Sequence, residues 1–412
     1  MAVPQQFKCY IGEERLAKLQ KRLELTELPS ELEGVEPWTR GTPLSEIHRL
    51  HEYWMRGFDW RKAERDINLY PQFISEIEVE GFGAQSVHFM HVKSNNENAI
   101  PLLFVHGWPG SFHEASKIVP LLTAVSDDFP SFHVVAPSLP SFGFSGSVQK
   151  KGFHSGKHAE ALHKLMLSLG YTQYGESHLP LTIPMLLFEL AELIAILSYS
   201  YPEHCKAHHL NMVVASQPSE DQFPQLVEKI KKTPISEQEQ MGLDRSQKFF
   251  SEGMAYALMH AQRPQTIAYS MVDSPIGLLA WIYEKLHAWT DAYPWTDDEI
   301  LTWVCTYYFS TAGPHAPAQW YHENYYSECV STVTKYIDVK LGVSRFPLEI
   351  VQMPRLWAHT LGPIVFERNH DAGGHFAAWE RPQALVDDLR EMFGKNGGAF
   401  ECVVGKSGYK TG

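Results

Sequence analysis

The stretch that decides the fold is PLLFVHGWPGS, residues 101–111. Residues 101–105 form a short, continuous apolar run, which is typical of a strand buried on both faces of a parallel sheet. The glycines and proline that follow allow a tight loop whose backbone can approach a ligand closely. A second apolar run at 132–137 and a helical pattern at 158–169 come next. This alternation of buried strand and helix predicts an α/β domain with a parallel sheet.

The segments on either side of this domain predict the rest of the organisation. Upstream, helical spacing gives way to alternating strand patterns at 73–79 and 87–92. Downstream, buried strands vanish and helical, aromatic-rich segments dominate until strand character returns at 336–339. We therefore expect an N-terminal region (1–84), a first part of the α/β core (85–215), a helical cap (216–328), a second part of the core (329–395) and a flexible, glycine-rich tail (396–412).

Composition excludes several classes of function. The chain has 412 residues and a formal net charge of -13, so it gains no attraction to nucleic-acid phosphates. Its five cysteines are scattered without a CxxC pair, which favours reduced thiols in a cytoplasmic protein. The apolar stretch 179–197 contains two prolines and two glutamates, and this favours a buried core helix beginning near Pro184 over a membrane span. His204, His208 and His209 have no carboxylate or thiolate at a convincing ligand spacing, so we expect no metal site.

Two residues in the second part of the core have the positions of a histidine base and its acid. His375 lies on a Gly-Gly loop between the last predicted strand and the last predicted helix. A histidine there can reach a cleft and accept a proton near neutral pH. Glu349, in FPLE, precedes it in the chain and can fix its tautomer. Asp338 and Glu367 are the rival acids.

Other candidates lie in the loop after the first buried strand and in the cap. The loop brings His106, Gly107 and Pro109 around Trp108, whose backbone N–H is the candidate donor to negative charge developing in a transition state. In the cap, the phenols of Tyr256 and Tyr321 can donate hydrogen bonds to an ether-like oxygen. By composition alone, both tyrosines are better explained as aromatic core residues.

The order of the motifs carries a family resemblance. HGWPGS, PSFGFSG, AYALMHAQRPQT, DSPIGLLAWI, PAQWYHEN, FPLE and GGHFAAWE occur in the order seen in microsomal-type epoxide hydrolases, including their soluble fungal members. The resemblance implies an α/β-hydrolase fold with a helical cap and an N-terminal meander. It also implies hydrolysis of an apolar epoxide to a vicinal diol through an ester intermediate, with water as co-substrate and no cofactor. By this resemblance, Tyr256 and Tyr321 are expected to hold the epoxide oxygen, and His375, supported by Glu349, is expected to activate water.

One segment departs from the family pattern. The family nucleophile is the aspartate of a Gly-Gly-Asp elbow, but this chain reads GESHLPLTIP at 175–184 and has no aspartate from Phe129 to Glu220. The apolar strand that should lead into the elbow is also missing from the pattern. Three hypotheses follow: a relative that binds ligands without catalysis, a serine esterase that uses Ser177, or a segment that is an artefact of the gene model, with an intron retained and an exon lost. A homodimer is left open as well.

Overall fold

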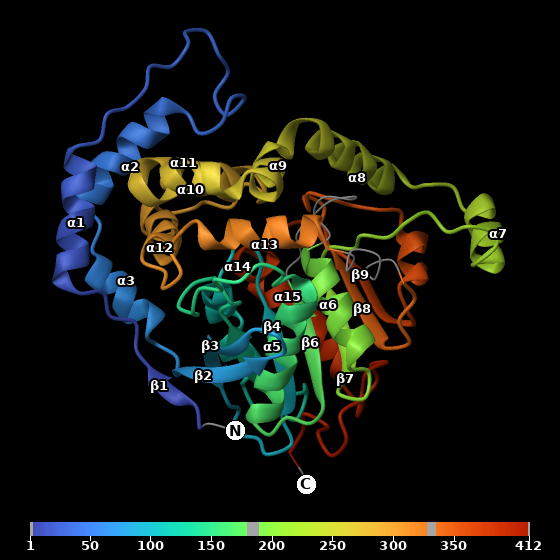
Figure 1. Ribbon diagram of the computed structural model, residues 1–412. Helices are drawn as coiled ribbons and strands as arrows, with labels where there is room; N and C mark the ends of the chain where they lie inside the picture. Colours follow the sequence, from blue (N-terminus) through green and yellow to red (C-terminus); the bar gives the residue numbers. More distant parts are fainter. Residues whose placement is uncertain (1–2, 179–188, 328–334, 411–412) are drawn as a thin grey trace.

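The computed structural model describes residues 3–178, 189–327 and 335–410. Its centre is one nine-stranded mixed sheet in the order β1-β2-β3-β5-β4-β6-β7-β8-β9 (Figure 1). The six strands from β5 to β9 run parallel, whereas β1, β2 and β3 extend the sheet in antiparallel pairs. The strands span Gln5–Phe7, Gln72–Val79, Gly83–Val92, Ile100–Val105, Phe132–Pro137, Tyr174–His178, Cys205–Leu210, Lys340–Arg345 and Ile364–Asn369.

Helices cover both faces of the parallel part. Helices α5 and α6 pack against each other over one face, and α15 packs with α4 over the other. Neighbouring residues of a strand point to opposite faces. Accordingly, Glu176 contacts α6, while a Cβ on Gly175 would meet Phe393 of α15. The core helices are η1 (Phe112–Lys117), α4 (Val119–Leu122), α5 (Ser155–Ser168), α6 (Glu189–Ser200), η4 (Arg355–Thr360), α14 (Ala377–Glu380) and α15 (Pro382–Phe393).

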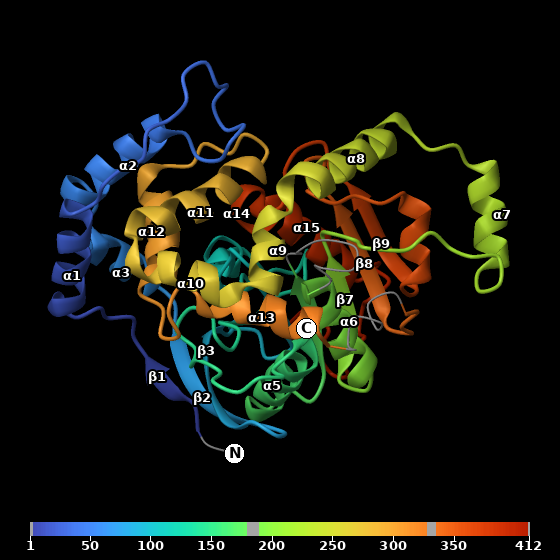
Figure 2. The same cartoon turned by 45° about the horizontal axis from the view of Figure 1, so that its top comes forward.

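The predicted cap is present as a layer of helices between β7 and β8 in the chain. It lies over the carboxyl ends of the parallel strands, and α7 projects from its side (Figures 1 and 2). The cap contains α7 (Pro224–Lys232), α8 (Glu237–Lys248), η2 (Phe249–Gly253), α9 (Ala255–Gln262), α10 (Pro264–Asp273), α11 (Pro275–Ala288), α12 (Asp297–Tyr308) and α13 (Ala316–Tyr325). The carboxyl edge of a parallel sheet is where α/β proteins bind ligands, so the cap closes over the expected position of a site.

The N-terminal region packs on both the cap and the sheet. Helices α1 (Glu13–Glu24), α2 (Leu44–Arg56) and α3 (Trp60–Ile67) run along the outer side of the cap, while β1 pairs with β2. Tyr53 donates a hydrogen bond to Asp298 over 2.8 Å, and Arg22 donates one to the carbonyl of Val272 over 2.7 Å. The meander therefore ties α10 and α12 of the cap to the edge of the sheet.

The central strand forms, although its sequence lacks the apolar pattern expected of it. β6 forms and pairs with β4 and β7. Two of its polar side chains, Glu176 and Ser177, each contact a buried polar residue. The hydroxyl of Ser198 donates to Glu176 over 2.9 Å, and the Oγ of Ser177 lies 3.4 Å from Nδ1 of His209. The helix predicted to begin near Pro184 is described only from Glu189, and Pro184 itself lies outside the described residues.

The tail, which the sequence predicts to be flexible, packs against the core: Ala399 is fully buried, and the carbonyl of Gly408 accepts a hydrogen bond from the backbone N–H of Ser131 over 2.8 Å. The strand predicted at 336–339 begins only at Lys340.

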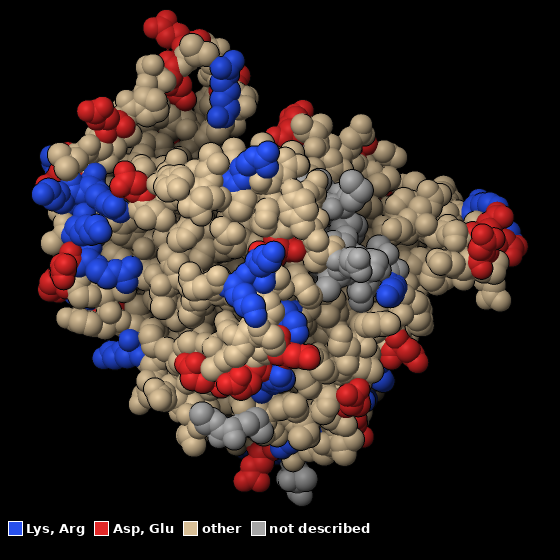
Figure 3. Space-filling view, viewed as in Figure 1, with Lys and Arg blue, Asp and Glu red and all other residues tan. Residues whose placement is uncertain are grey.

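No helix within the described residues has the length and apolar character to span a membrane. On the face seen in Figure 3, acidic and basic side chains are interspersed, so neither sign forms a broad field there.

Candidate active site

His375 and Glu349 form the buried pair that the sequence predicted. His375 follows β9 and Glu349 follows β8, so both lie at the carboxyl edge of neighbouring parallel strands. Nδ1 of His375 is 2.7 Å from Oε1 of Glu349, and each residue is 2% exposed. With Nδ1 held by the acid, Nε2 is the nitrogen that can exchange a proton with a substrate. The rival acids lie elsewhere, because Glu367 pairs with Arg345 and Asp338 is exposed.

The loop that carries His375 is fixed by two carboxylates. Gly373 has a φ of +115°, which glycine adopts readily, and its N–H donates to Asp291 over 2.8 Å. The N–H of Gly374 donates to Glu380 over 2.9 Å, and Glu380 also accepts from the N–H of Asp291. Burial raises the pKa of Glu380 to about 7 despite these donors. The histidine is therefore held in place by its backbone as well as by Glu349.

The two cap tyrosines are brought together over the loop after β4. Tyr256 of α9 stacks on the indole of Trp108 at a centroid distance of 4.9 Å. Tyr321 of α13 meets the same indole edge-on at 6.2 Å, and the two phenol rings are also 6.2 Å apart. Both tyrosines are buried, at 1% and 0% exposure. The pair is thus close enough for two phenols to act on one small ligand.

Trp289, at the end of α11, joins this pair to the histidine. Its ring centroid lies 5.4 Å from that of Tyr256 and 5.1 Å from that of His375. Its carbonyl also accepts the N–H of His375 over 2.8 Å. Sequence reasoning did not single out Trp289. Its only signal was membership of the tryptophan and tyrosine cluster in the cap, which does not distinguish lining residues from packing residues.

Lys285, also of α11, was missed as well. It is 4% exposed, and its Nζ lies 4.9 Å from the ring centroid of Tyr256 and 2.6 Å from a carboxylate oxygen of Glu284. Burial lowers the pKa of this ammonium, and Glu284 opposes that shift. A cation over a phenol ring stabilises negative charge on that ring. Lys285 thereby favours Tyr256 as a hydrogen-bond donor.

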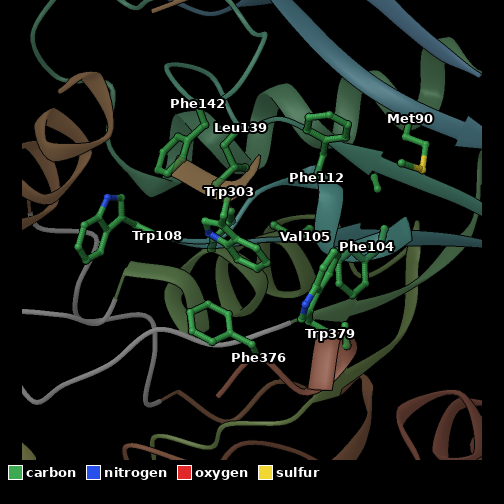
Figure 4. Packing of buried hydrophobic residues seen from close by; sticks show 14 of the residues in the cluster. Met90, Phe104, Val105, Trp108, Phe112, Leu139, Phe142, Trp303, Phe376 and Trp379 are labelled. Atoms are coloured by element: carbon green, nitrogen blue, oxygen red, sulfur yellow. The ribbon is translucent and has the colours of Figure 1, made fainter. Parts of the chain in front are cut away.

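The loop of residues 106–111 is held from the cap side. Trp303 and Tyr307 of α12 donate hydrogen bonds to the carbonyls of Pro109 and Gly110 over 2.5 and 2.6 Å. The Trp108–Pro109 peptide bond is cis. Figure 4 shows Trp303 beside Phe376 and Trp379 in this apolar packing, with Trp108 at its edge. Helix α12 of the cap therefore holds the loop in place, and the loop in turn presents Trp108 to the two tyrosines.

His106 and Glu114 hold the same loop through buried hydrogen bonds. Nε2 of His106 accepts the N–H of Leu139 over 3.2 Å, and its Nδ1 lies 3.1 Å from the carbonyl of Gly107. Burial lowers the pKa of His106 to about 4, so it is a neutral link between two loops. This geometry does not support a substrate-binding role for His106. Glu114 accepts the N–H of Ser111 over 2.9 Å, and burial raises its pKa to about 8.

Ser177 does not lie where the serine hypothesis needs it. It is fully buried inside β6, and its Oγ faces His209 rather than His375. Nε2 of His209 is 2.8 Å from the hydroxyl of Ser344, which in turn donates to Asp388. The remainder of the segment that departs from the family pattern, residues 179–188, lies outside the described residues. Among the described residues, no three histidine, cysteine or acidic side chains form a group that could hold a metal ion.

Comparisons with known proteins agree with this architecture. Residues 4–115 match the family described as epoxide hydrolase N terminus, and residues 100–175 match the alpha/beta hydrolase fold. Epoxide hydrolase 1 of Sus scrofa is 31% identical, over 94% of this chain and 88% of its own. The structure of Aspergillus niger epoxide hydrolase superposes with a TM-score of 0.79 at 32% identity, covering 94% of this chain and 95% of that one. Juvenile hormone epoxide hydrolase of Bombyx mori shares the fold, with a TM-score of 0.83 at 24% identity over 94% and 93% of the two chains.

Proposed function

The chain belongs to the epoxide hydrolase family, and from this premise we propose that its buried site hydrolyses an apolar epoxide to a vicinal diol. The observation that carries the proposal is the placement of the histidine–glutamate pair beside Trp289 and of two phenols beside Trp108, with Tyr256 in contact with both indole rings. The reaction needs a base for water and a donor for the epoxide oxygen, and these residue types supply both.

Tyr256 and Tyr321 act on the epoxide oxygen. When the C–O bond breaks, negative charge develops on that oxygen, and two phenolic hydrogen bonds stabilise the charge. The surrounding rings exclude water, which strengthens these hydrogen bonds. The same lining favours an aryl or alkyl epoxide over a polar one.

His375 acts on water. Its Nε2 takes one proton from water, and Glu349 stabilises the imidazolium that forms. This step belongs to the ester route that the family resemblance implies, where water cleaves the ester. It belongs equally to a direct attack of water on the epoxide carbon.

The oxygen isotope in the first product distinguishes the two routes. The chain has no aspartate between Phe129 and Glu220, so the ester route requires a carboxylate from elsewhere. In a single turnover in water enriched in oxygen-18, an ester route places an unlabelled carboxylate oxygen in the first diol. Direct attack places oxygen-18 there at once.

The function itself is tested by diol formation from a racemic aryl epoxide, with the folded protein beside its His375→Ala variant. We expect turnover that the substitution lowers by several orders of magnitude, up to about 10⁶-fold as when the histidine base of a catalytic triad is removed. Absence of turnover in protein shown to be folded would contradict the proposal and leave a relative that binds ligands only. Labelling of Ser177 by a fluorophosphonate would instead support the serine esterase.

We propose a cytoplasmic protein, because Cys9, Cys205, Cys305 and Cys402 are free thiols and the first three are buried. Cell fractionation tests this. The homodimer alternative is tested by light scattering of the purified protein.

A further inference from the structure

The two carboxylate oxygens of Glu349 have unequal surroundings. Oε1 is 2.7 Å from Nδ1 of His375 and also accepts the backbone N–H of Ile350 over 2.7 Å. Oε2 is equally buried, but none of the described residues donates a hydrogen bond to it. Buried polar side-chain atoms nearly always have a hydrogen-bond partner. The observed contacts therefore account for only one of the two oxygens of Glu349.

Asn211 is a second buried residue whose polar atoms lack hydrogen-bond partners among the described residues. It follows β7, the neighbour of β8 in the sheet, and is 1% exposed. Both Oδ1 and Nδ2 of its amide are buried without a hydrogen-bond partner among the described residues. Buried amides are nearly always paired, so an amide with both atoms unpaired needs an explanation.

Asn211 and Glu349 line the same small cavity. The cavity has a volume of about 10 Å³, and its other lining residues include Phe346, Val351, Gln352 and Arg345. A volume of this size accommodates about one water molecule, and a buried water needs two to four polar partners. The unpaired atoms of Asn211 and Glu349 supply that number.

We propose that Asn211 is a positioning residue for Glu349, acting through one ordered water in this cavity. The water accepts from Nδ2 of Asn211 and donates to Oε2 of Glu349. This fixes the second oxygen, so the carboxylate cannot rotate away from His375. The role of the pair in catalysis rests on the proposed function, whereas the geometry of the pair does not.

The charged neighbours of Glu349 are engaged with other groups. Arg245 of α8 directs its Nε to the main-chain carbonyl of Glu349 over 3.2 Å. Arg345 of β8 lines the cavity, but its Nη1 pairs with Glu367 at 2.6 Å. Glu380 of α14, which interacts electrostatically with Glu349, accepts the N–H of Gly374. The amide of Gln352, which also lines the cavity, donates to the carbonyl of Pro347, so Asn211 is the cavity residue whose amide donor is unpaired.

The experiment compares Asn211→Leu with Asn211→Ser, using Asn96→Leu as a matched control. Leucine fills similar space without polar atoms, whereas serine keeps a hydroxyl and leaves room for water. Asn96 is a buried asparagine at 3% exposure, but its amide bonds to Ser131 and Gly408, remote from the site. The first readout is the downfield Nδ1–H proton resonance of His375, assigned by its loss in His375→Ala. The second readout is the pH profile of kcat.

We expect the resonance to broaden or vanish in Asn211→Leu and to return in Asn211→Ser, with no change in Asn96→Leu. We expect kcat in Asn211→Leu to fall on the order of 10-fold or more at nearly unchanged KM, the scale seen when a partner of a functional side chain is removed. An unchanged resonance in folded Asn211→Leu would overturn the proposal. If the resonance responds as expected while the parent protein shows no turnover, Asn211 positions the pair and only the proposed function fails.

Discussion

Glu176, in the middle of the central strand, makes the stability of this fold depend on pH. Its side chain is fully buried, and burial raises its pKa from 4.5 to about 8, although the hydroxyl of Ser198 partly opposes the shift. At neutral pH the folded protein therefore holds this carboxyl group protonated, whereas the unfolded chain ionises it. Replacing it in Glu176→Gln keeps the shape of the side chain and removes the titration.

The sign and size of this pH dependence follow from proton linkage between folding and ionisation of Glu176. A folded-state pKa above the unfolded value gives stability that is complete below about pH 4.5, declines as pH rises and is lost above about pH 8. Each pKa unit corresponds to about 1.4 kcal/mol. Between pH 5 and pH 8 the wild type should therefore lose about 3 to 4 kcal/mol of unfolding free energy relative to Glu176→Gln.

Urea unfolding at pH 5, 6.5 and 8 measures this difference. The matched control is Glu78→Gln, a glutamate that also lies on a strand but is exposed. We expect the gap between wild type and Glu176→Gln to widen steadily with pH, while the gap for the control stays constant. A gap for Glu176→Gln that changes by less than about 1 kcal/mol over this range would refute the reasoning that burial keeps the carboxyl group neutral.

Three further outcomes follow from the same structure. In Gly110→Ala the new Cβ would lie 1.9 Å from Oε1 of the buried Glu114, so we expect a loss of about 1–3 kcal/mol in thermal unfolding. Tyr307→Phe leaves the carbonyl of Gly110 without its cap donor, and we expect a loss of about 1–3 kcal/mol together with a lower kcat. Burial lowers the pKa of His88 to about 3 and that of His106 to about 4. The contribution of these neutral histidines to the free energy of unfolding is complete above pH 6.5 and is lost as pH falls. Circular dichroism should therefore show cooperative acid unfolding below about pH 6.

The sequence was sufficient to predict the base and its acid because topology determines where they lie. His375, Glu349 and Trp108 each follow a strand of the parallel part of the sheet, and the carboxyl ends of such strands meet at one edge. Reading the order of strands and loops was therefore enough to bring them together. The site residues of the cap were harder to predict from the sequence, because Trp289 and Lys285 differ from packing residues only in where the helices place them.

The central strand could not be predicted because its partners lie far away in the chain. One oxygen of Glu176 accepts a hydrogen bond from Ser198, on the helix that follows, and Ser177 lies against His209 of the next strand. Through Ser344 this second contact continues to Asp388 of α15. A local pattern search expects apolar residues in a buried strand, and it has no means to detect polar partners supplied by tertiary structure.

The described site further predicts that ligand binding and turnover can be separated. Tyr256 and Tyr321 come from α9 and α13, whereas β6 and the segment after it contribute neither phenol. A nonreactive ether that mimics the epoxide oxygen should therefore bind the wild type even where turnover fails. The double substitution Tyr256→Phe with Tyr321→Phe removes two hydrogen bonds and should weaken binding roughly 10- to 100-fold, at about 1 kcal/mol for each bond. Calorimetric titration measures the change, and equal affinity in the two proteins would show that the phenols do not hold the oxygen.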